Sequence, residues 1–206
     1  MSVALEPPEV AAEEPDVPTE PIWRLTVEQY HEMVRHGILG EDDPVELLNG
    51  WLVTKMTQNT FHRAAVKLVY RSLDRIVPEG WYVDSQGPIT LLASEPEPDV
   101  VLVRGDTRQY LDGHPGPGDV ALVVEVADAS VRRDRLLKKS IYARAKILVY
   151  WIVNLVERRV EVYSEPQGTG RQAGYRQHRE YTVDEEVPLI IEEREIGRIP
   201  VRSLLP

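Results

Sequence analysis

Two acidic residues stand in strongly apolar segments. Glu125 interrupts the apolar run at residues 120–126, and Asp99 opens a second run, residues 99–103, directly after Pro98. A buried carboxylate without a partner costs several kcal/mol, so each acid needs compensation. Two converging carboxylates repel each other unless a cation or a proton lies between them, and oxygen ligands suit Mg²⁺ or Mn²⁺. The pair therefore predicts a hard-metal site, although an ion pair or a strand end that reaches water would explain Glu125 alone.

Three further polar residues are candidates for the same site. Glu46 lies in an apolar strand-like segment, where alternation could equally point its side chain to water. His62, on a predicted helix, could contact the acids or a phosphate, but a structural role is the alternative. Gln86 comes just before Gly87-Pro88, and a strand break of this kind can aim a side chain at an edge site.

A lysine can reach the acids from the helix that follows Glu125. The buried stripe of this helix is predicted by Leu137, Ile141 and Ala145, which are spaced by four. At 100° per residue, Lys138 and Tyr142 lie at the margin of that stripe, whereas Lys139 lies about 200° away. We therefore expect Lys138 to reach the site with Tyr142 in support, and Lys139 to point to water. An ordinary surface pair between Lys138 and Asp134 is the alternative.

The same helix is basic, with seven Lys or Arg residues against Asp134 alone over residues 131–146. Such clustering favours a surface that faces phosphates, although many charge runs are only solvated faces. The predicted nucleic-acid contacts are Arg132, Arg133, Arg135 and Lys139.

The elements that must position these residues alternate between helix and strand. A helix capped by Thr26 and ended by Gly37 precedes a hairpin, Val45–Leu48 and Trp51–Met56, around Asn49-Gly50. The following elements are predicted in order: helix Thr60–Val77; strands Trp81–Leu92, Asp99–Val103 and Asp119–Val126; a helix from Asp128–Ser130 to about Ala145; strands Ile147–Val153 and Arg159–Ser164. Glu165–Gly174 reads as a polar loop, and the last 30 residues as short strand-like pieces. This α-β-β-β-α-β order indicates an α/β fold with Asp119–Val126 as its central strand.

Composition bounds the class of protein. The chain has 206 residues, 42% hydrophobic and 28% charged, with a formal net charge of −10 and no cysteine. Cysteine nucleophiles and cysteine-ligated zinc are therefore excluded, and no apolar run approaches the roughly 20 residues of a membrane-spanning helix. Residues 1–21 hold six acids, five prolines and no Lys or Arg, which predicts a disordered acidic leader before a single domain over residues 22–206. We expect a cytoplasmic protein.

Several ordered segments resemble a known family. They are Glu46-Leu47-Leu48-Asn49-Gly50; His62; Glu97-Pro98-Asp99-Val100; Val124-Glu125-Val126-Ala127-Asp128-Ala129-Ser130; Asp134-Arg135 with Lys138 and Tyr142; and Tyr150-Trp151-Ile152-Val153. Individually weak but specific as an ordered set, they are similar to the Uma-type family of bacterial putative restriction endonucleases, placed in the PD-(D/E)XK nuclease superfamily. The resemblance runs from about Leu25 to Ser164, is expected to continue to the C-terminus, and leaves the leader outside.

The resemblance implies a restriction-endonuclease-like core in which Asp99 and Glu125 bind the divalent metal, a lysine assists the nucleophile and Glu46 adds an acid. The superfamily lysine stands two residues after the acid, where this chain has Ala127, so Lys138 would replace it from the next helix. Two further departures, Leu136 and Lys146, stand where the family usually has glycine and affect only the positioning of Lys138 and the turn after its helix.

These observations predict an endonuclease that hydrolyses phosphodiester bonds with Mg²⁺ or Mn²⁺. Nucleic acid is the expected partner, with DNA favoured over RNA, and a homodimer stays open. A nuclease fold kept as a DNA- or protein-binding module without turnover is the alternative, because the superfamily lysine is displaced. Sugar hydrolysis by a carboxylate pair ranks third, because the few aromatic residues lie mostly in apolar runs.

Overall fold

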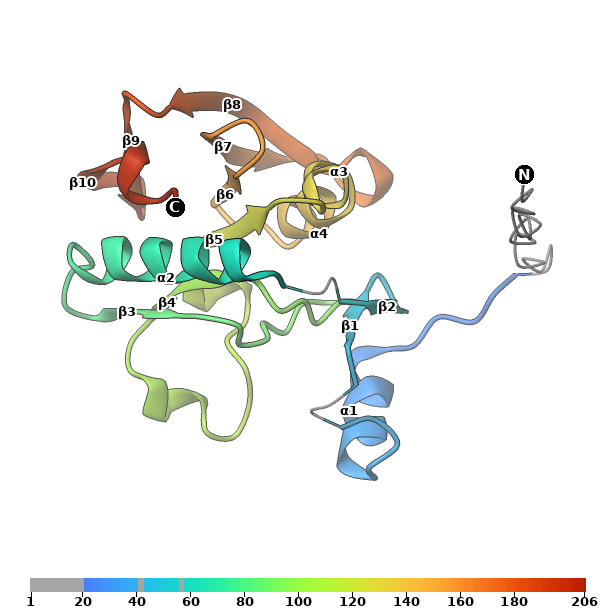
Figure 1. Ribbon diagram of the computed structural model, residues 1–206. Helices are drawn as coiled ribbons and strands as arrows, with labels where there is room; N and C mark the ends of the chain where they lie inside the picture. Colours follow the sequence, from blue (N-terminus) through green and yellow to red (C-terminus); the bar gives the residue numbers. More distant parts are fainter. Residues whose placement is uncertain (1–20, 41–42, 56–57) are drawn as a thin grey trace, which may run out of the picture.

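A computed structural model describes residues 21–40, 43–55 and 58–206 (Figure 1). The acidic leader expected over residues 1–21 therefore lies outside the described residues, apart from Pro21. Within the described ranges, no helix combines the length and the apolar character needed to cross a membrane.

A six-stranded mixed sheet forms the centre of the molecule. Its strand order is β3-β4-β5-β6-β7-β8, with β5 and β6 parallel and every other neighbouring pair antiparallel. The strands are β3 (Trp81–Asp84), β4 (Val100–Arg104), β5 (Val120–Ala127), β6 (Val149–Asn154), β7 (Arg159–Gln167) and β8 (Gly174–Thr182). Every residue of β5 and β6 is buried, as expected for strands that are covered on both faces. The predicted central strand and the α-β-β-β-α-β order are confirmed.

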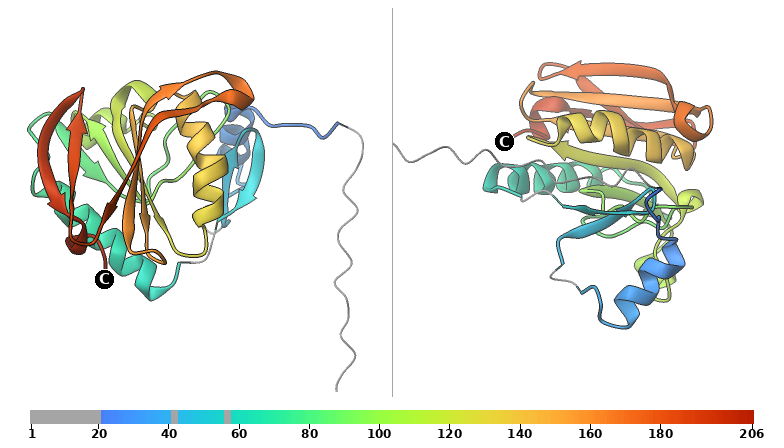
Figure 2. Two further views of the ribbon diagram at one scale, coloured as in Figure 1. Left: turned by 90° about the horizontal axis from the view of Figure 1, so that it is seen from above. Right: turned by 90° about the vertical axis from the view of Figure 1, so that its right-hand side faces the viewer.

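One face of the sheet is covered by helix α2 (Thr60–Asp74) and by a hairpin of β9 (Glu186–Ile191) and β10 (Arg194–Pro200) (Figures 1 and 2). Asn59 caps α2 by accepting a hydrogen bond from the His62 backbone N–H. The helix buries Ala65, Val66, Val69 and Leu73, spaced as an amphipathic helix requires. This capped and packed first turn fixes the position of His62.

The opposite face is covered by one helical segment with three parts: α3 (Val131–Arg133), the π-helical turn η3 (Asp134–Lys138) and α4 (Lys139–Arg144). Within the turn, the Lys139 backbone N–H donates to the carbonyl of Asp134, five residues back. Asp134, Lys138 and Tyr142 are all buried. Single π turns inside α-helices occur frequently at functional sites.

The N-terminal helix and hairpin are confirmed, although the second strand of the hairpin ends at Thr54 and the predicted end, Met56, lies outside the described residues. Helix α1 (Val27–Arg35) begins with a capping box in which Thr26 and Gln29 bond each other's backbone N–H groups. Strands β1 (Val45–Leu48) and β2 (Trp51–Thr54) form the hairpin, with positive φ at Asn49 and Gly50. A Cβ at position 50 would lie 2.7 Å from the Arg24 Cβ, so the turn requires glycine.

Several sequence predictions are wrong in extent. The helix expected over Thr60–Val77 ends at Asp74. The strand expected over Trp81–Leu92 ends at Asp84, because Gln86 has φ +59° and Pro88 has no N–H to donate, so the chain leaves the ladder. The loop expected over Glu165–Gly174 is shorter, since β7 continues to Gln167 and Pro166 pairs with Tyr175 on β8. The last residues form three full strands rather than short pieces.

Candidate active site

A pocket of about 440 Å³ brings together most of the predicted site residues. It lies among hairpin β1–β2, the first turn of α2, the start of β4, the end of β5 and the segment α3–η3. Its lining residues are Glu46, Lys55, Gln58, Asn59, His62, Gln86, Glu97, Asp99, Glu125, Val126, Asp128, Ala129, Ser130, Arg133, Asp134 and Lys138.

Glu125 lies at the floor of this pocket with only 4% of its surface exposed. Its Oε1 accepts hydrogen bonds from Lys138 Nζ at 2.9 Å and from the Tyr142 hydroxyl at 2.6 Å. Burial raises the pKa of Glu125 to about 8; the ammonium of Lys138 opposes this rise, while the carboxylates of Asp134, Asp99 and Glu46 add to it. The site therefore disfavours the ionised form of Glu125 next to the other carboxylates unless a further cation binds.

Asp99, just before β4, is held from two sides. Its Oδ2 accepts the Val126 backbone N–H at 2.8 Å and lies 3.2 Å from His62 Nε2. Burial lowers the pKa of His62, but the hydrogen bond and the charge of Asp99 outweigh it, so the pKa is raised overall. The imidazolium form of His62 thus partly neutralises Asp99.

Lys138 joins Glu125 to Glu46. Its ammonium, 3% exposed, lies 3.4 Å from Glu46 Oε2 on strand β1. Burial lowers the pKa of Lys138, but the charges of Glu125, Glu46 and Asp134 outweigh it, so the pKa is raised and the lysine stays charged. Glu46 is 2% exposed and accepts the Glu97 backbone N–H, so the alternative in which Glu46 points to water is wrong.

Asp134 was missed as a site residue, because the sequence suggested only a surface pair with Lys138. It lines the pocket, is 1% exposed, and accepts the Ser130 hydroxyl at 2.6 Å through Oδ2. Its Oδ1 has no partner among the described residues, and burial raises its pKa. A visible signal was the polar series Ser130, Asp134, Lys138 and Tyr142, which repeats every four residues.

Two of the three predicted supporting residues, Tyr142 and Gln86, are placed differently from each other. Tyr142 was expected to support Lys138, but its hydroxyl binds Glu125, at the same oxygen as the lysine. Gln86 lines the pocket, where its side-chain amide donates to Gln58 Oε1. The catalytic roles of these side chains stay predictions.

The four predicted nucleic-acid contacts do not form one surface. Arg133 lines the pocket, donates to the Thr54 carbonyl and lies 3.9 Å from Glu46. Arg132 is exposed beside a neighbouring hollow. Arg135 is held by the carboxylates of Glu157 and Glu161. Lys139 was expected to point to water, but its side chain is half-buried and its ammonium lies 5.0 Å from the centroid of the Tyr163 ring. We therefore keep only Arg133 and Arg132 as candidate phosphate contacts.

The donor set fits a hard divalent cation. Asp99 Oδ1 and Glu125 Oε2 make no hydrogen bond with other described residues, and both acids line the same pocket. Among the residues that the structure describes, no group of three His, Asp or Glu side chains is arranged as a metal cage. Mg²⁺ commonly uses only one or two protein carboxylates, with water and substrate phosphate as its other ligands. Two free carboxylate oxygens meet that requirement.

Glu125→Gln is expected to gain stability over the wild type as pH rises from about 5 to 8. The unfolded carboxyl ionises near its ordinary pKa of 4.5, whereas the folded one keeps its proton to about 8. Unfolding thus releases a proton in this window, and wild-type stability falls as pH rises, by several kcal/mol in all. Urea unfolding of both proteins in EDTA at each pH measures the difference. The same difference at every pH would contradict a raised pKa.

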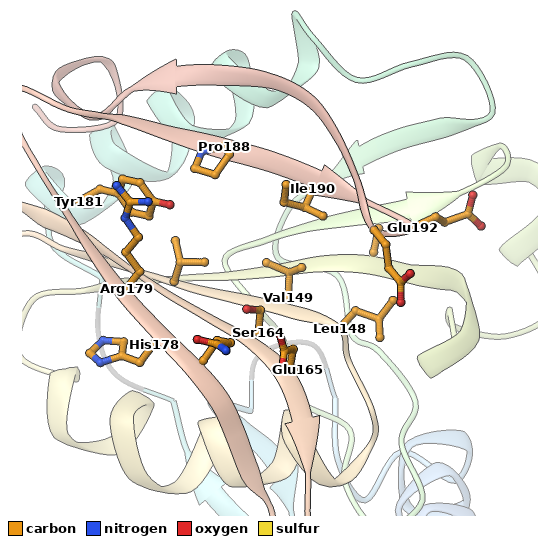
Figure 3. A pocket seen from close by; sticks show the side chains of 14 residues that line it. Leu148, Val149, Ser164, Glu165, His178, Arg179, Tyr181, Pro188, Ile190 and Glu192 are labelled. Atoms are coloured by element: carbon orange, nitrogen blue, oxygen red, sulfur yellow. The ribbon is translucent and has the colours of Figure 1, made fainter.

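A second hollow, of about 410 Å³, lies between hairpin β9–β10 and strands β5 to β8 of the sheet (Figure 3). Its walls are largely apolar, with Val149, Tyr181 and Ile190 among them, and Glu165 and Glu192 also line it. None of the catalytic candidates predicted from the sequence lines this hollow. The chemistry-bearing side chains thus converge on the acidic pocket.

Comparisons with known proteins concern the family and the fold of this chain. The Uma2 family model, described as putative restriction endonuclease, matches residues 27–194. A comparison with curated proteins gives no match. The crystal structure of a putative nuclease belonging to DUF820 from Anabaena variabilis is similar, with a TM-score of 0.62 and 14% identity over 87% of this chain and 97% of that chain. At this identity the likeness concerns the fold, and the expected restriction-endonuclease-like α/β fold is confirmed. Because the family model spans most of the sequence, the chain belongs to the Uma2 family of putative restriction endonucleases.

Proposed function

We propose that this protein is a metal-dependent endonuclease that hydrolyses phosphodiester bonds in nucleic acid, with DNA as the favoured substrate. Family membership supports nuclease function. The observation that carries the proposal is the buried Glu125, which shares one pocket with Asp99 and lies 2.9 Å from Lys138. Buried acids with a raised pKa in a pocket are typical of functional sites.

Asp99 and Glu125 would hold Mg²⁺ or Mn²⁺ through their two free oxygens. When bound, such an ion lowers the pKa of water and offsets negative charge on the phosphate. Such a cation would also offset the repulsion from Asp134, Asp99 and Glu46, which adds to the effect of burial on the pKa of Glu125.

The side chains around the acids have separate tasks in this proposal. Lys138 orients the attacking water or neutralises the scissile phosphate, and it is already charged and desolvated for that purpose. Tyr142 fixes the Glu125 carboxylate through its hydroxyl. His62 holds Asp99 and, as an imidazolium, can also contact a phosphate oxygen.

A binding module without turnover is the second candidate. Two observations favour it. Lys138 and Tyr142 already occupy Oε1 of Glu125, and Ala127 stands where the superfamily has its lysine. Such a module would retain affinity for nucleic acid but would not cut it with any metal.

Incubation of the purified protein with supercoiled plasmid, short single-stranded DNA and RNA, each with Mg²⁺, Mn²⁺ or EDTA, tests the proposal. We expect nicked or linear products with a divalent ion and none with EDTA. Cleavage that survives EDTA would contradict metal dependence. Binding without cleavage in every metal would favour the second candidate.

A further inference from the structure

The solvent-exposed side of α2 carries a row of cations: Arg63, Lys67 and Arg71 within the helix, and Arg75 directly after it. The four residues are spaced by four. At 100° per residue, they centre on the side of the helix opposite its buried residues. At 1.5 Å per residue, neighbouring cations lie about 6 Å apart along the axis, and the row extends about 18 Å.

This row is not neutralised within the part of the chain that the structure describes. None of its four members forms an ion pair or a side-chain hydrogen bond with another described residue, whereas Arg135, Arg159 and Arg198 each bind a carboxylate. The one acid on α2 is Asp74. The protein as a whole is acidic, with a net charge of −10, so general basicity does not explain the row.

Like charges at i,i+4 destabilise a helix by about 0.2–0.5 kcal/mol per pair. The row contains three such pairs and brings no compensating contact among the described residues. A polyanion bound along this side of the helix would relieve the repulsion and use all four charges together.

The row begins at the acidic pocket. Asn59, the cap of α2, lines that pocket and donates to Asp128, while His62 in the first turn lies 3.2 Å from Asp99. Arg63 is the next residue, and the helix leads away from hairpin β1–β2, as Figure 1 shows. A hollow of about 200 Å³ lies midway, between Lys67, Tyr70, Arg71 and Ser85. An anionic chain that follows the row would therefore lead into the pocket.

We propose that Arg63, Lys67, Arg71 and Arg75 bind the sugar–phosphate backbone of the nucleic-acid substrate on one side of the scissile bond. This inference rests on the proposed function and extends it, because it assigns the path of the substrate on one side of the scissile bond to α2, in addition to the candidate contacts of Arg132 and Arg133 on α3. Phosphate contacts of this kind set affinity and position without reading bases.

The test compares the wild type with the triple variant Arg63→Gln, Lys67→Gln, Arg71→Gln. The matched control removes three exposed cations from other elements: Arg108→Gln, Arg176→Gln, Arg194→Gln. Fluorescence anisotropy follows binding to duplex DNA and to single-stranded DNA between 50 and 200 mM salt. Ca²⁺ replaces Mg²⁺, and gels verify that the DNA stays intact. Polyglutamate of matched length is a further probe, and steady-state cleavage with Mg²⁺ gives kcat and KM.

For duplex DNA, each lost phosphate contact lowers the slope of log K against log salt by about 0.9. The wild type should therefore lose about 40-fold more affinity than the triple variant between 50 and 200 mM salt. The variant should also raise KM with kcat unchanged, while the control should change both the slope and KM much less.

Three outcomes would overturn the inference, and a fourth would overturn the proposed function on which it rests. If the triple variant and the control lose affinity equally, the row contributes only general charge. If polyglutamate binds the wild type as tightly as DNA and loses binding in the triple variant alone, the surface binds acidic protein. If the wild type binds and cuts DNA but the triple variant has the same salt slope and the same KM, only the proposed path of the substrate is wrong. If the wild type neither binds nor cuts DNA, the proposed function itself fails.

Discussion

Asp99→Asn and Glu125→Gln are each expected to reduce nucleic-acid cleavage by about 10³-fold or more while the protein stays folded. Each change removes one of the two proposed metal ligands, which line the same pocket. The electrostatic help of a bound metal amounts to several kcal/mol in the transition state, and every 1.36 kcal/mol corresponds to tenfold in rate. Initial rates of plasmid nicking at saturating Mg²⁺ measure the effect.

A matched carboxylate supplies the control for these two variants. Glu97 lines the same pocket, but its carboxylate pairs with Lys55 at 2.6 Å and is more exposed. Glu97→Gln should change the nicking rate by less than about tenfold, since it removes one surface ion pair and no proposed ligand. Thermal unfolding adds an independent readout: Mg²⁺ should raise the Tm of the wild type and of Glu97→Gln, but not of Asp99→Asn. Wild-type nicking by Asp99→Asn or Glu125→Gln would overturn the assignment of the metal ligands.

The positions of Asp99 and Glu125 could be predicted because a carboxylate in an apolar strand must have partners that offset the cost of its burial. An apolar strand such as β5 leaves Glu125 no route to water, so its partners had to come from neighbouring elements. The same argument applied to Asp99 at the start of β4. Helical phase then placed Lys138 within reach of the site at the sheet edge, and the structure has this lysine 2.9 Å from Glu125.

Other parts of the site could not be predicted because they depend on contacts between elements distant in sequence. Arg135 seemed available to phosphate, yet it is fixed by Glu161 on β7, a buried acid that also accepts from Asn154 and Tyr163. The alternation of side chains along β7 gave no sign that Glu161 faces the helical segment that contains Arg135. Glu46 was ambiguous for the same reason, because only the tertiary position of hairpin β1–β2 decides which face is covered.

The π turn is a further feature that sequence periodicity does not reveal. It falls on Asp134–Lys138 and contains both the overlooked acid and the proposed catalytic lysine. A regular helix over this segment predicted Lys139 in water, whereas its ammonium lies on the Tyr163 ring. Two ion pairs hold this turn. Near its start Arg135 pairs with Glu161, and at its end Lys138 pairs with Glu125. This arrangement fixes which of the two adjacent lysines enters the pocket.

Lys138→Met and Lys139→Met separate these two lysines by function. We expect Lys138→Met to lower kcat by about 10²-fold or more, because it removes a preorganised charge next to the proposed reaction centre. Lys139→Met should change kcat by less than about twofold, since its ammonium contacts Tyr163 outside the pocket. Steady-state cleavage with Mg²⁺ measures both, and circular dichroism with thermal unfolding verifies that each variant is folded.

Lost activity alone does not show that Lys138 is catalytic, because removal of its ammonium also leaves Glu125 and Glu46 buried without their shared cation. Methionine keeps most of the side-chain volume, and Glu125 can keep a proton in the folded state, so the variant should fold at neutral pH. Isothermal titration should show that Lys138→Met still binds Mg²⁺, since the two proposed ligands remain. If Lys138→Met loses Mg²⁺ binding and activity together, the lysine only positions Glu125. If both variants lower kcat equally, the different positions of the two lysines, Lys138 in the pocket and Lys139 at Tyr163, do not matter for catalysis.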